Sequence, residues 1–488
     1  KTLKKYENDL IQEKEASIFW PNLELVWRGE VTNYIEKNLL WVDREIFSDL
    51  SELAKKNNPI NPEFYEKYDV KRGLRNNNGT GVLVGLTKIG EVKGYELRDD
   101  QKIPCKGELF YRGIELQTFV KGFQEEKRYG FEECIYLLLF GNLPSKSELL
   151  QFNDVLDSFR ELPKNFKEKL IFAHPSKDVM NQIQRSLLGL YTYDNIPEDL
   201  SISNLVSQSL NLIAKLPTLV AYSYQAKIHN YDAKSMYIHS SQSGKGTAEN
   251  ILYMIRPNSE YTKLEAEILD LLLVVHAEHG GGNNSAFTTR VLASSGTDIY
   301  SIIAAAIGSL KGPKHGGANL KVYEMIENIK DNIGAYPSNE ELKEYLRKML
   351  KKEVFDNSGL IYGMGHAIYT ESDPRAVLLK EKARELSVQK GTEKDFALYE
   401  NIEKLTKEIF KEQKGEEAII AANVDLYSGF VYRMLDIPTE IFTPLFAIAR
   451  MGGWCAHRIE QILSDVKIIR PAYRSVAEKV EYIPLEKR

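Results

Sequence analysis

The sequence predicts a mainly α-helical protein of two domains, with one small β-hairpin region near the N-terminus. The chain has 488 residues, which is more than one hydrophobic core usually organises. Short strand-like runs separated by glycine and proline occur in one stretch only, residues 76–116. From residue 117 almost to the end, apolar residues recur at helical spacing. Many helices with a single β patch are typical of a mainly α fold.

The elements follow in order along the chain. Residues 1–75 are charged, aromatic and rich in asparagine, which favours two or three short helices joined by turns. Residues 76–116 predict one or two hairpins, and "FEECIYLLLFG" predicts a helix that ends at Gly141. Residues 264–275 have one apolar face, and residues 298–310 form an alanine-rich helix. Capping boxes are predicted at three helix starts: Ser145 with Glu148, Ser338 with Glu341, and Thr392 with Asp395.

Composition excludes several classes of protein. A net charge of −5 argues against a general nucleic-acid binder, and the longest apolar run, residues 268–275, is too short to cross a membrane. The cysteines Cys105, Cys134 and Cys455 are widely spaced, so neither a disulfide framework nor a zinc site is indicated. Acidic residues among the first 17 positions do not fit a signal or transit peptide. We therefore expect a cytoplasmic protein with reduced thiols.

Glycine-flanked histidines mark the stretches that could carry chemistry. Of eight histidines, four lie in "HAEHGGGNNS" (276–285), "GPKHGGAN" (312–319) and "GMGH" (363–366), and "NVDLYSG" (423–429) adds an aspartate. Each stretch alone has a structural explanation: a histidine near a helix end is more often a core residue than a catalyst. Asp425 could simply cap a helix, and Arg450 and Arg470 could be surface arginines. His276 and His279 are only three residues apart without further ligands, so no metal site is expected.

Taken together, these motifs resemble the citrate synthase family. The resemblance runs from "TKIGEVKG" at residue 87 to "RPAY" at 473 and includes H-x-x-H-x-x-x-N-x-S, GPxHGGAN, GxGH…DPR and NVDxxSG in the family's order. It implies the two-domain citrate synthase fold: a large helical domain of residues 1–316, completed by 437–488, and a small helical domain of residues 317–436. The site would lie in the cleft between them and close by a hinge.

The resemblance also implies a reaction, in which acetyl-CoA condenses with oxaloacetate and the thioester is hydrolysed to citrate and CoA. Asp425 is similar to the family's base and His315 to its donor toward the thioester oxygen. Ser285 would orient His315 through a side-chain hydrogen bond, and Asn283 would support this arrangement. Because the resemblance places His315 at the start of a helix, the helix dipole is expected to lower its pKa and keep it neutral. No metal and no permanently bound cofactor are implied.

The oxaloacetate residues implied by the resemblance are His366, which would polarise the ketone, and a set of carboxylate binders: His279, Arg375, Arg450 and Arg470. Arg470 would reach in from the partner subunit, so a homodimer is expected. Lys314 and Lys321 could contact CoA phosphates, or could equally be solvated lysines. Thr370, Met364 and Gly280 stand where relatives often carry arginine, an aromatic residue and glutamate, so CoA contacts and acyl preference are open.

Two other functions stay possible at this point. A 2-methylcitrate synthase would use propionyl-CoA, and one methylene is worth only ~1–3 kcal/mol of discrimination. A paralogue that binds ligand without catalysis would be expected to have lost at least one of the key residues. The enzyme reading instead implies a role in the tricarboxylic acid cycle.

Overall fold

The computed structural model describes residues 44–99, 101–464 and 467–488, with the side chains of 44–46 left out. The chain divides into two compact units, one of Lys1–Asn77 with Tyr473–Arg488 and the other of Asn78–Ala472. The predicted domain boundaries at residues 316 and 436 lie within the second unit and stay a prediction.

The first unit joins segments from the two ends of the sequence. It contains helices α4 (Arg44–Asn57) and α5 (Glu63–Lys67) and short 3-10 turns at Arg72–Leu74 and Leu485–Lys487. The guanidinium of Arg474 lies 4.2 Å from the ring centroid of Tyr68, a cation–π contact between the two segments. The predicted short helices are therefore confirmed for residues 44–75, while residues 1–43 lie outside the described part.

A three-stranded antiparallel sheet opens the second unit, which confirms the predicted β region. Its strands are β1 (Gly90–Arg98), β2 (Gln101–Tyr111) and β3 (Ile114–Glu115), in the order β1-β2-β3. The β1–β2 pairing runs from Gly90 opposite Tyr111 to Arg98 opposite Gln101. Leu109 and Tyr111 are fully buried, whereas the far end of the hairpin is more exposed.

Helices form the rest of the second unit, as predicted. Before residue 317 they are α6 (Leu116–Glu125), α7 (Phe131–Phe140), α8 (Lys146–Phe159), a π-helical turn (Lys167–Phe172), α9 (Val179–Leu190), a 3-10 turn (Tyr191–Tyr193), α10 (Ile202–Tyr231), α11 (Thr247–Ile255), α12 (Lys263–His276), α13 (Asn284–Ala293) and α14 (Ile299–Lys311). After it come α15 (Ala318–Ile333), α16 (Asn339–Leu350), α17 (Pro374–Lys390), α18 (Glu393–Lys414), α19 (Val424–Met434), a 3-10 turn (Thr439–Ile441) and α20 (Phe442–Ser464).

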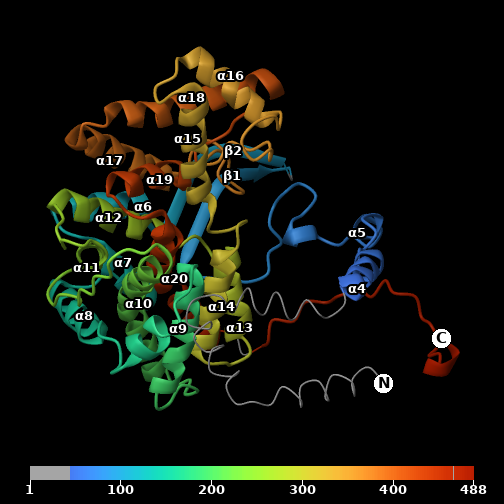
Figure 1. The fold of residues 1–488 in the computed structure, drawn as a ribbon, viewed down its shortest axis with the longest axis horizontal. Coiled ribbons are helices and arrows are strands. Elements are labelled where there is room, and N and C mark those ends of the chain that lie inside the picture. Colours follow the sequence, from blue (N-terminus) through green and yellow to red (C-terminus); the bar gives the residue numbers. More distant parts are fainter. Residues whose placement is uncertain (1–43, 100, 465–466) are drawn as a thin grey trace, which may run out of the picture. The chain divides into compact units, whose positions relative to one another are not determined.

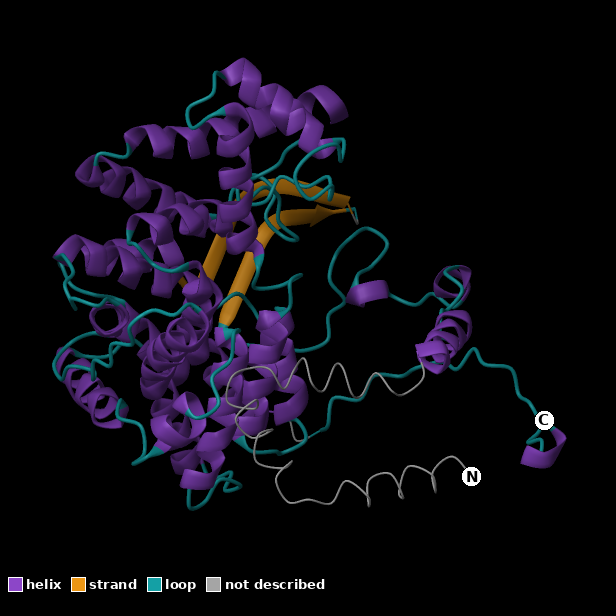
Figure 2. Ribbon diagram, viewed as in Figure 1, coloured by secondary structure: helices purple, strands orange, loops and turns teal. Residues whose placement is uncertain are grey.

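Helix α20 organises the core of this unit. It is buried over most of its length and packs against α7, α10, α12, α13 and α14. Helices α15–α19 pack largely on one another and gather at one end of the unit (Figure 1). The β1–β2 hairpin, orange in Figure 2, extends from the helices around α20 toward this group. The site residues come from both groups of helices and from the loops between them.

Local signals set several helix ends as expected. Gly141 ends α7 in the left-handed conformation, at φ 87°, and the capping boxes at Ser145 and Ser338 are formed. The capping box predicted at Thr392 is wrong, because its side chain makes no cap hydrogen bond. Asp395 instead pairs with Lys330 of α15 over 2.6 Å, so a tertiary ion pair has taken the carboxylate away from the helix start.

Candidate active site

The loop that carries His366 is fastened to the start of α19. Met364 forms an antiparallel bridge with Ala422, and Asn423 donates from Nδ2 to the carbonyl oxygen of Gly365 over 2.8 Å. Gly363 and Gly365 have φ values of 84° and 86°, which side chains other than glycine rarely adopt. The glycines of "GMGH" therefore allow the backbone conformation that brings His366 next to the helix bearing Asp425.

The hydrogen bonds of His366 define its protonation. Its Nδ1 accepts from the backbone N–H groups of Ile368 and Tyr369, each over 3.1 Å. A ring nitrogen that accepts carries no proton, so the proton of the neutral ring is on Nε2. The ring stacks on Tyr369, with centroids 4.6 Å apart, and lies edge-on to His279, with centroids 5.1 Å apart. A neutral His366 therefore carries its ring proton on Nε2, the nitrogen opposite the one fixed by the loop.

The two histidines after the apolar stretch of α12 differ in role. His276 is fully buried and donates from Nδ1 to the carbonyl oxygen of Leu272 over 2.8 Å, as a core histidine does. Burial lowers its pKa to about 3. His279 lies beyond the helix and is also buried; Nε2 has no partner among the described residues in either histidine, but of the two only His276 makes a hydrogen bond to that part of the chain through Nδ1. Burial, followed by the charge of Arg375, holds the pKa of His279 well below its usual value.

Arg450 of α20 is fully buried, so its interpretation as a surface arginine is wrong. Its Nε donates to the carbonyl oxygen of His276 over 2.6 Å, and its guanidinium lies 4.8 Å from the ring centroid of Phe446. Its two terminal nitrogens are buried and have no partner among the described residues. Burial lowers the pKa of Arg450 to about 10, although Glu278 opposes the shift. Such donors are suited to an anionic ligand.

Arg375 and Asp373 form a buried bidentate ion pair. Arg375 donates from Nε and from one terminal nitrogen to the two carboxylate oxygens of Asp373, over 2.9 and 2.7 Å. Asp373 also caps α17 and accepts the backbone N–H of Val424 over 3.2 Å, so it links α17 to α19. Burial opposes the charge of Arg375, but the charge of Asp373 outweighs it and raises the pKa of the guanidinium.

Asp425 lies in the first turn of α19. Asn423 is the cap of this helix, because its Oδ1 accepts the backbone N–H of Asp425 over 3.0 Å. The interpretation of Asp425 as a helix cap is therefore wrong, and its carboxylate is not used for capping. Burial raises the pKa of Asp425 to about 6, although the charge of Arg375 acts in the opposite direction. A carboxylate with a pKa in this range is suited to act as a base.

His315 lies in the turn before α15, and its Nε2 is 3.1 Å from Oγ of Ser285. The same hydroxyl oxygen lies 2.8 Å from Oδ1 of Asn283 and accepts a hydrogen bond from Nε1 of Trp454 over 3.1 Å. The predicted low pKa of His315 is confirmed, at about 4, but its first cause is burial and its second the charge of Arg450. The expected helix dipole is not needed to explain it.

The residues described so far are called the site cluster here: His279, His315, His366, Arg375, Asp425 and Arg450. Three other predicted site residues have no described contact with this cluster. Arg470 has an exposed side chain, and no described contact joins it to the cluster; the neighbouring backbone N–H of Ile469 bonds to Ser294. Lys314 is exposed, and Lys321 pairs with Glu324 over 2.7 Å. Sequence reasoning also missed Tyr369, Asp373 and Trp454. Only Asp373 had a local signal, its position as the cap immediately before Pro374.

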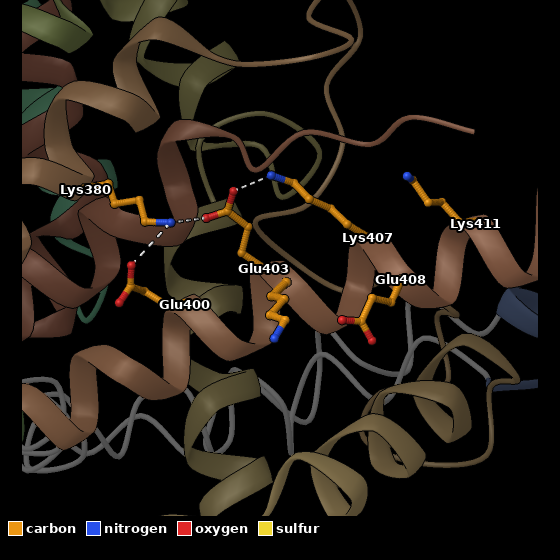
Figure 3. A pocket seen from close by; sticks show the side chains of 7 residues that line it. Lys380, Glu400, Glu403, Lys407, Glu408 and Lys411 are labelled. Carbon is orange, nitrogen blue, oxygen red and sulfur yellow. Dashed lines mark hydrogen bonds and ion pairs between the residues drawn. The ribbon is translucent and has the colours of Figure 1, made fainter. Parts of the chain in front are cut away.

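A cavity of about 430 Å³ between α17 and α18 is a different kind of site (Figure 3). Its side chains are charged and pair with each other: Lys380 with Glu400 and Glu403, and Lys407 with Glu403. The histidines and Arg450 are not among its lining residues. Elsewhere in the described ranges, no group of three or more metal-ligating side chains is arranged to hold an ion, and no helix has the length and apolarity of a membrane span.

Comparisons with known proteins identify the family of the chain. The family model described as citrate synthase, C-terminal domain, matches residues 77–472. A citrate synthase of Synechocystis is 35% identical over 411 residues, 84% of this chain and 92% of that protein. 2-Methylcitrate synthase 1 of Corynebacterium glutamicum is 32% identical over 426 residues, 86% of this chain and 98% of that protein. The chain belongs to the citrate synthase family.

A solved structure shows the same fold. Citrate synthase from Thermoplasma acidophilum, in a ternary complex with carboxymethyl coenzyme A and oxaloacetate, superposes with a TM-score of 0.70. The match covers 86% of this chain and 99% of that one, at 24% sequence identity. The predicted fold class is thus confirmed.

Proposed function

We propose that this protein condenses acetyl-CoA with oxaloacetate and hydrolyses the resulting thioester, giving citrate and CoA. The observation that carries the proposal is that three of the buried side-chain nitrogens without a partner among the described residues lie on predicted oxaloacetate binders, namely Nε2 of His279 and the two terminal nitrogens of Arg450. Buried polar groups are rarely left unpaired in a folded protein, so a ligand of opposite character is implied. The carboxylates of oxaloacetate have that character.

His366 would polarise the second substrate. With its proton on Nε2, it donates a hydrogen bond to the ketone oxygen of oxaloacetate and makes the ketone carbon electrophilic. The same hydrogen bond stabilises the alkoxide that forms on attack. Arg375 and Arg450 bind the carboxylates, and Arg470 would add a third cation from the partner of a homodimer.

Asp425 and His315 would make the nucleophile. Asp425 removes a proton from the methyl carbon of acetyl-CoA, while His315 donates to the thioester oxygen as negative charge develops there. For Nδ1 of neutral His315 to donate, Nε2 must accept. Trp454 can only donate to Ser285, and in the structure the single hydroxyl proton of Ser285 is directed at Oδ1 of Asn283, so in this step that proton must turn from Asn283 to His315.

The proposal includes a domain arrangement and a compartment. Residues 317–436 would close against residues 1–316 and 437–488 over the bound substrates, and Lys314 or Lys321 would contact CoA phosphates. Cys105, Cys134 and Cys455 are unpaired, which supports a reducing compartment such as the cytosol. In that setting the reaction would feed the tricarboxylic acid cycle.

A second candidate is 2-methylcitrate synthase, because relatives of that name match the chain nearly as well as citrate synthases do. The assay is release of free thiol from acetyl-CoA and from propionyl-CoA, each with oxaloacetate. The proposal predicts the larger kcat/KM with acetyl-CoA. A larger value with propionyl-CoA would establish the second candidate, and thiol release from neither would indicate a ligand-binding paralogue.

A further inference from the structure

The ladder between β1 and β2 is interrupted at Gly94. Lys93 pairs with Glu108 and Tyr95 with Pro104, so the three residues 105–107 of β2 stand opposite Gly94 alone. An interruption of this kind is a β-bulge, and it leaves backbone N–H and C=O groups to be satisfied from outside the ladder. The bulge lies on the part of the hairpin that approaches the loop after His366.

Thr370, which lies in that loop, makes hydrogen bonds to backbone groups of the bulge. Its hydroxyl donates to the carbonyl oxygen of Gly94 over 2.5 Å and accepts the backbone N–H of Cys105 over 3.2 Å. Two residues further on, Oγ of Ser372 accepts the backbone N–H of Gly107 over 3.2 Å. One hydroxyl thus bridges the two strands, and a second holds the end of the bulge.

Two glycines let the backbones touch. A Cβ atom on Gly94 would lie 2.6 Å from both the carbonyl oxygen of Ile368 and Cα of Tyr369. A Cβ atom on Gly107 would collide with the carbonyl oxygen of Ser372. Because these obstacles are backbone atoms, no side-chain rotation could relieve the clash. The hairpin therefore rests directly on the peptides of residues 368–372.

Those peptides orient the site. The N–H groups of Ile368 and Tyr369 are the two donors to Nδ1 of His366, and Tyr369 stacks on its ring. Asp373 and Arg375 follow immediately in the chain. A hairpin fixed to residues 368–372 therefore fixes the position of the donor N–H groups, and through them the direction of Nε2 of His366.

We propose that the β1–β2 hairpin positions the oxaloacetate half of the site, and that Thr370 is the positioning residue through which it acts. The proposal rests on the function proposed above. Thr370 has no direct role in the reaction: its hydroxyl holds the hairpin, and the hairpin holds the peptides that direct His366.

The test is Thr370→Val, which keeps the shape of the side chain and removes both hydrogen bonds. Amide hydrogen exchange of residues 366–372 should quicken at least ~10-fold, as local opening becomes easier. The KM for oxaloacetate should rise ~10-fold, while the KM for the acyl-CoA stays within about twofold. Thr370→Ser, which keeps the hydroxyl, should restore both values. Thr218→Val is the matched control. Thr218 lies in α10, and its hydroxyl donates to the carbonyl oxygen of Arg160, away from the site.

Three results would overturn the proposal: exchange in residues 366–372 that matches the Thr218→Val control, faster exchange with an unchanged KM for oxaloacetate, or a rise in KM that Thr370→Ser does not reverse. Hydrogen exchange needs no turnover. If the unmodified protein releases no thiol, the proposed function fails, and the site claim is then decided by oxaloacetate affinity from calorimetry in place of KM.

Discussion

Arg450 donates from Nε to the carbonyl oxygen of His276 over 2.6 Å, and this contact leaves its two terminal nitrogens buried without a partner among the described residues. An arriving carboxylate can accept from both nitrogens at once, in the bidentate geometry that guanidinium favours. On the proposed function, the partner of this buried charge would arrive with the substrate.

Replacing this charge should abolish stabilisation by oxaloacetate. At a ligand concentration of ~100 Kd, the unmodified protein gains about 2.7 kcal/mol of stability. Arg450→Met should show no oxaloacetate-dependent rise in melting temperature by calorimetry at the same concentration. Arg384→Met, which changes an exposed arginine of α17, serves as the control and should keep the full rise. An equal rise in both variants would remove Arg450 from the site.

The acid limb of the activity profile should follow Asp425. Its pKa is raised to about 6, so the base is protonated and inactive below that pH, and kcat/KM for oxaloacetate should fall ~10-fold per pH unit. The imidazole of His315, with a pKa lowered to about 4, stays mostly neutral down to about pH 5. Steady-state rates between pH 4.5 and 8 provide the measurement. A kcat/KM that stays flat down to pH 5 is incompatible with Asp425 as the base.

Asp425→Asn should stabilise the ligand-free protein at neutral pH. Because burial raises the pKa of this carboxyl in the folded state, its contribution to stability is present below pH ~4 and is lost as the pH rises through about 6. A shift of about two units corresponds to ~3 kcal/mol at most. Urea unfolding should show the gain at pH 7.5 and none at pH 4. Asp154→Asn, at an exposed position of α8, is the control, and a gain equal to that control would contradict the argument.

Removing the hydroxyl of Ser285 should slow the reaction and spare substrate binding. Ser285→Ala takes away the partner of Nε2 of His315, worth about 1–1.5 kcal/mol, so kcat should fall ~10-fold. Oxaloacetate affinity, measured by calorimetry, should change less than about twofold. Thr288→Ala removes a hydroxyl from the same helix, where it bonds only to Asn284, and should leave kcat unaltered. A loss confined to oxaloacetate affinity would mean that Ser285 acts in substrate binding and not through His315.

Complementation between subunits tests the proposed role of Arg470. Arg470→Ala and Asp425→Asn should each be inactive alone. When the two variants are unfolded and refolded together, mixed dimers should contain one intact site and recover about a quarter of the unmodified activity, the statistical limit for random pairing. The double variant in one chain, mixed with itself, gives the baseline. If mixing restores nothing, Arg470 does not act across an interface.

The sequence predicted most of the secondary structure because its signals are local. Gly141, the Ser145 cap and the single glycine-rich β stretch act within a few residues of themselves. Thr392 shows the limit, since Asp395 had a distant partner in Lys330 that no local pattern reveals.

For the site, the family motifs identified His279, His315, His366, Arg375, Arg450 and Asp425, which the structure gathers in one unit. They did not identify the residues that hold these groups in place. Trp454 reaches Ser285 across 169 positions, and Thr370 reaches Gly94 across 276. Contacts of that kind depend on how helices and loops meet in space, and a single sequence carries no periodic trace of them.

The cation–π contact between Tyr68 and Arg474 has a consequence for the polypeptide's ends. Residues 473–488, which begin shortly after Arg470, belong to the same compact unit as residues 44–77. Residues 44–77 can thereby act as the anchor for residues 473–488. Removing residues 44–77 would release residues 473–488, which begin three positions after an arginine that the proposed reaction requires.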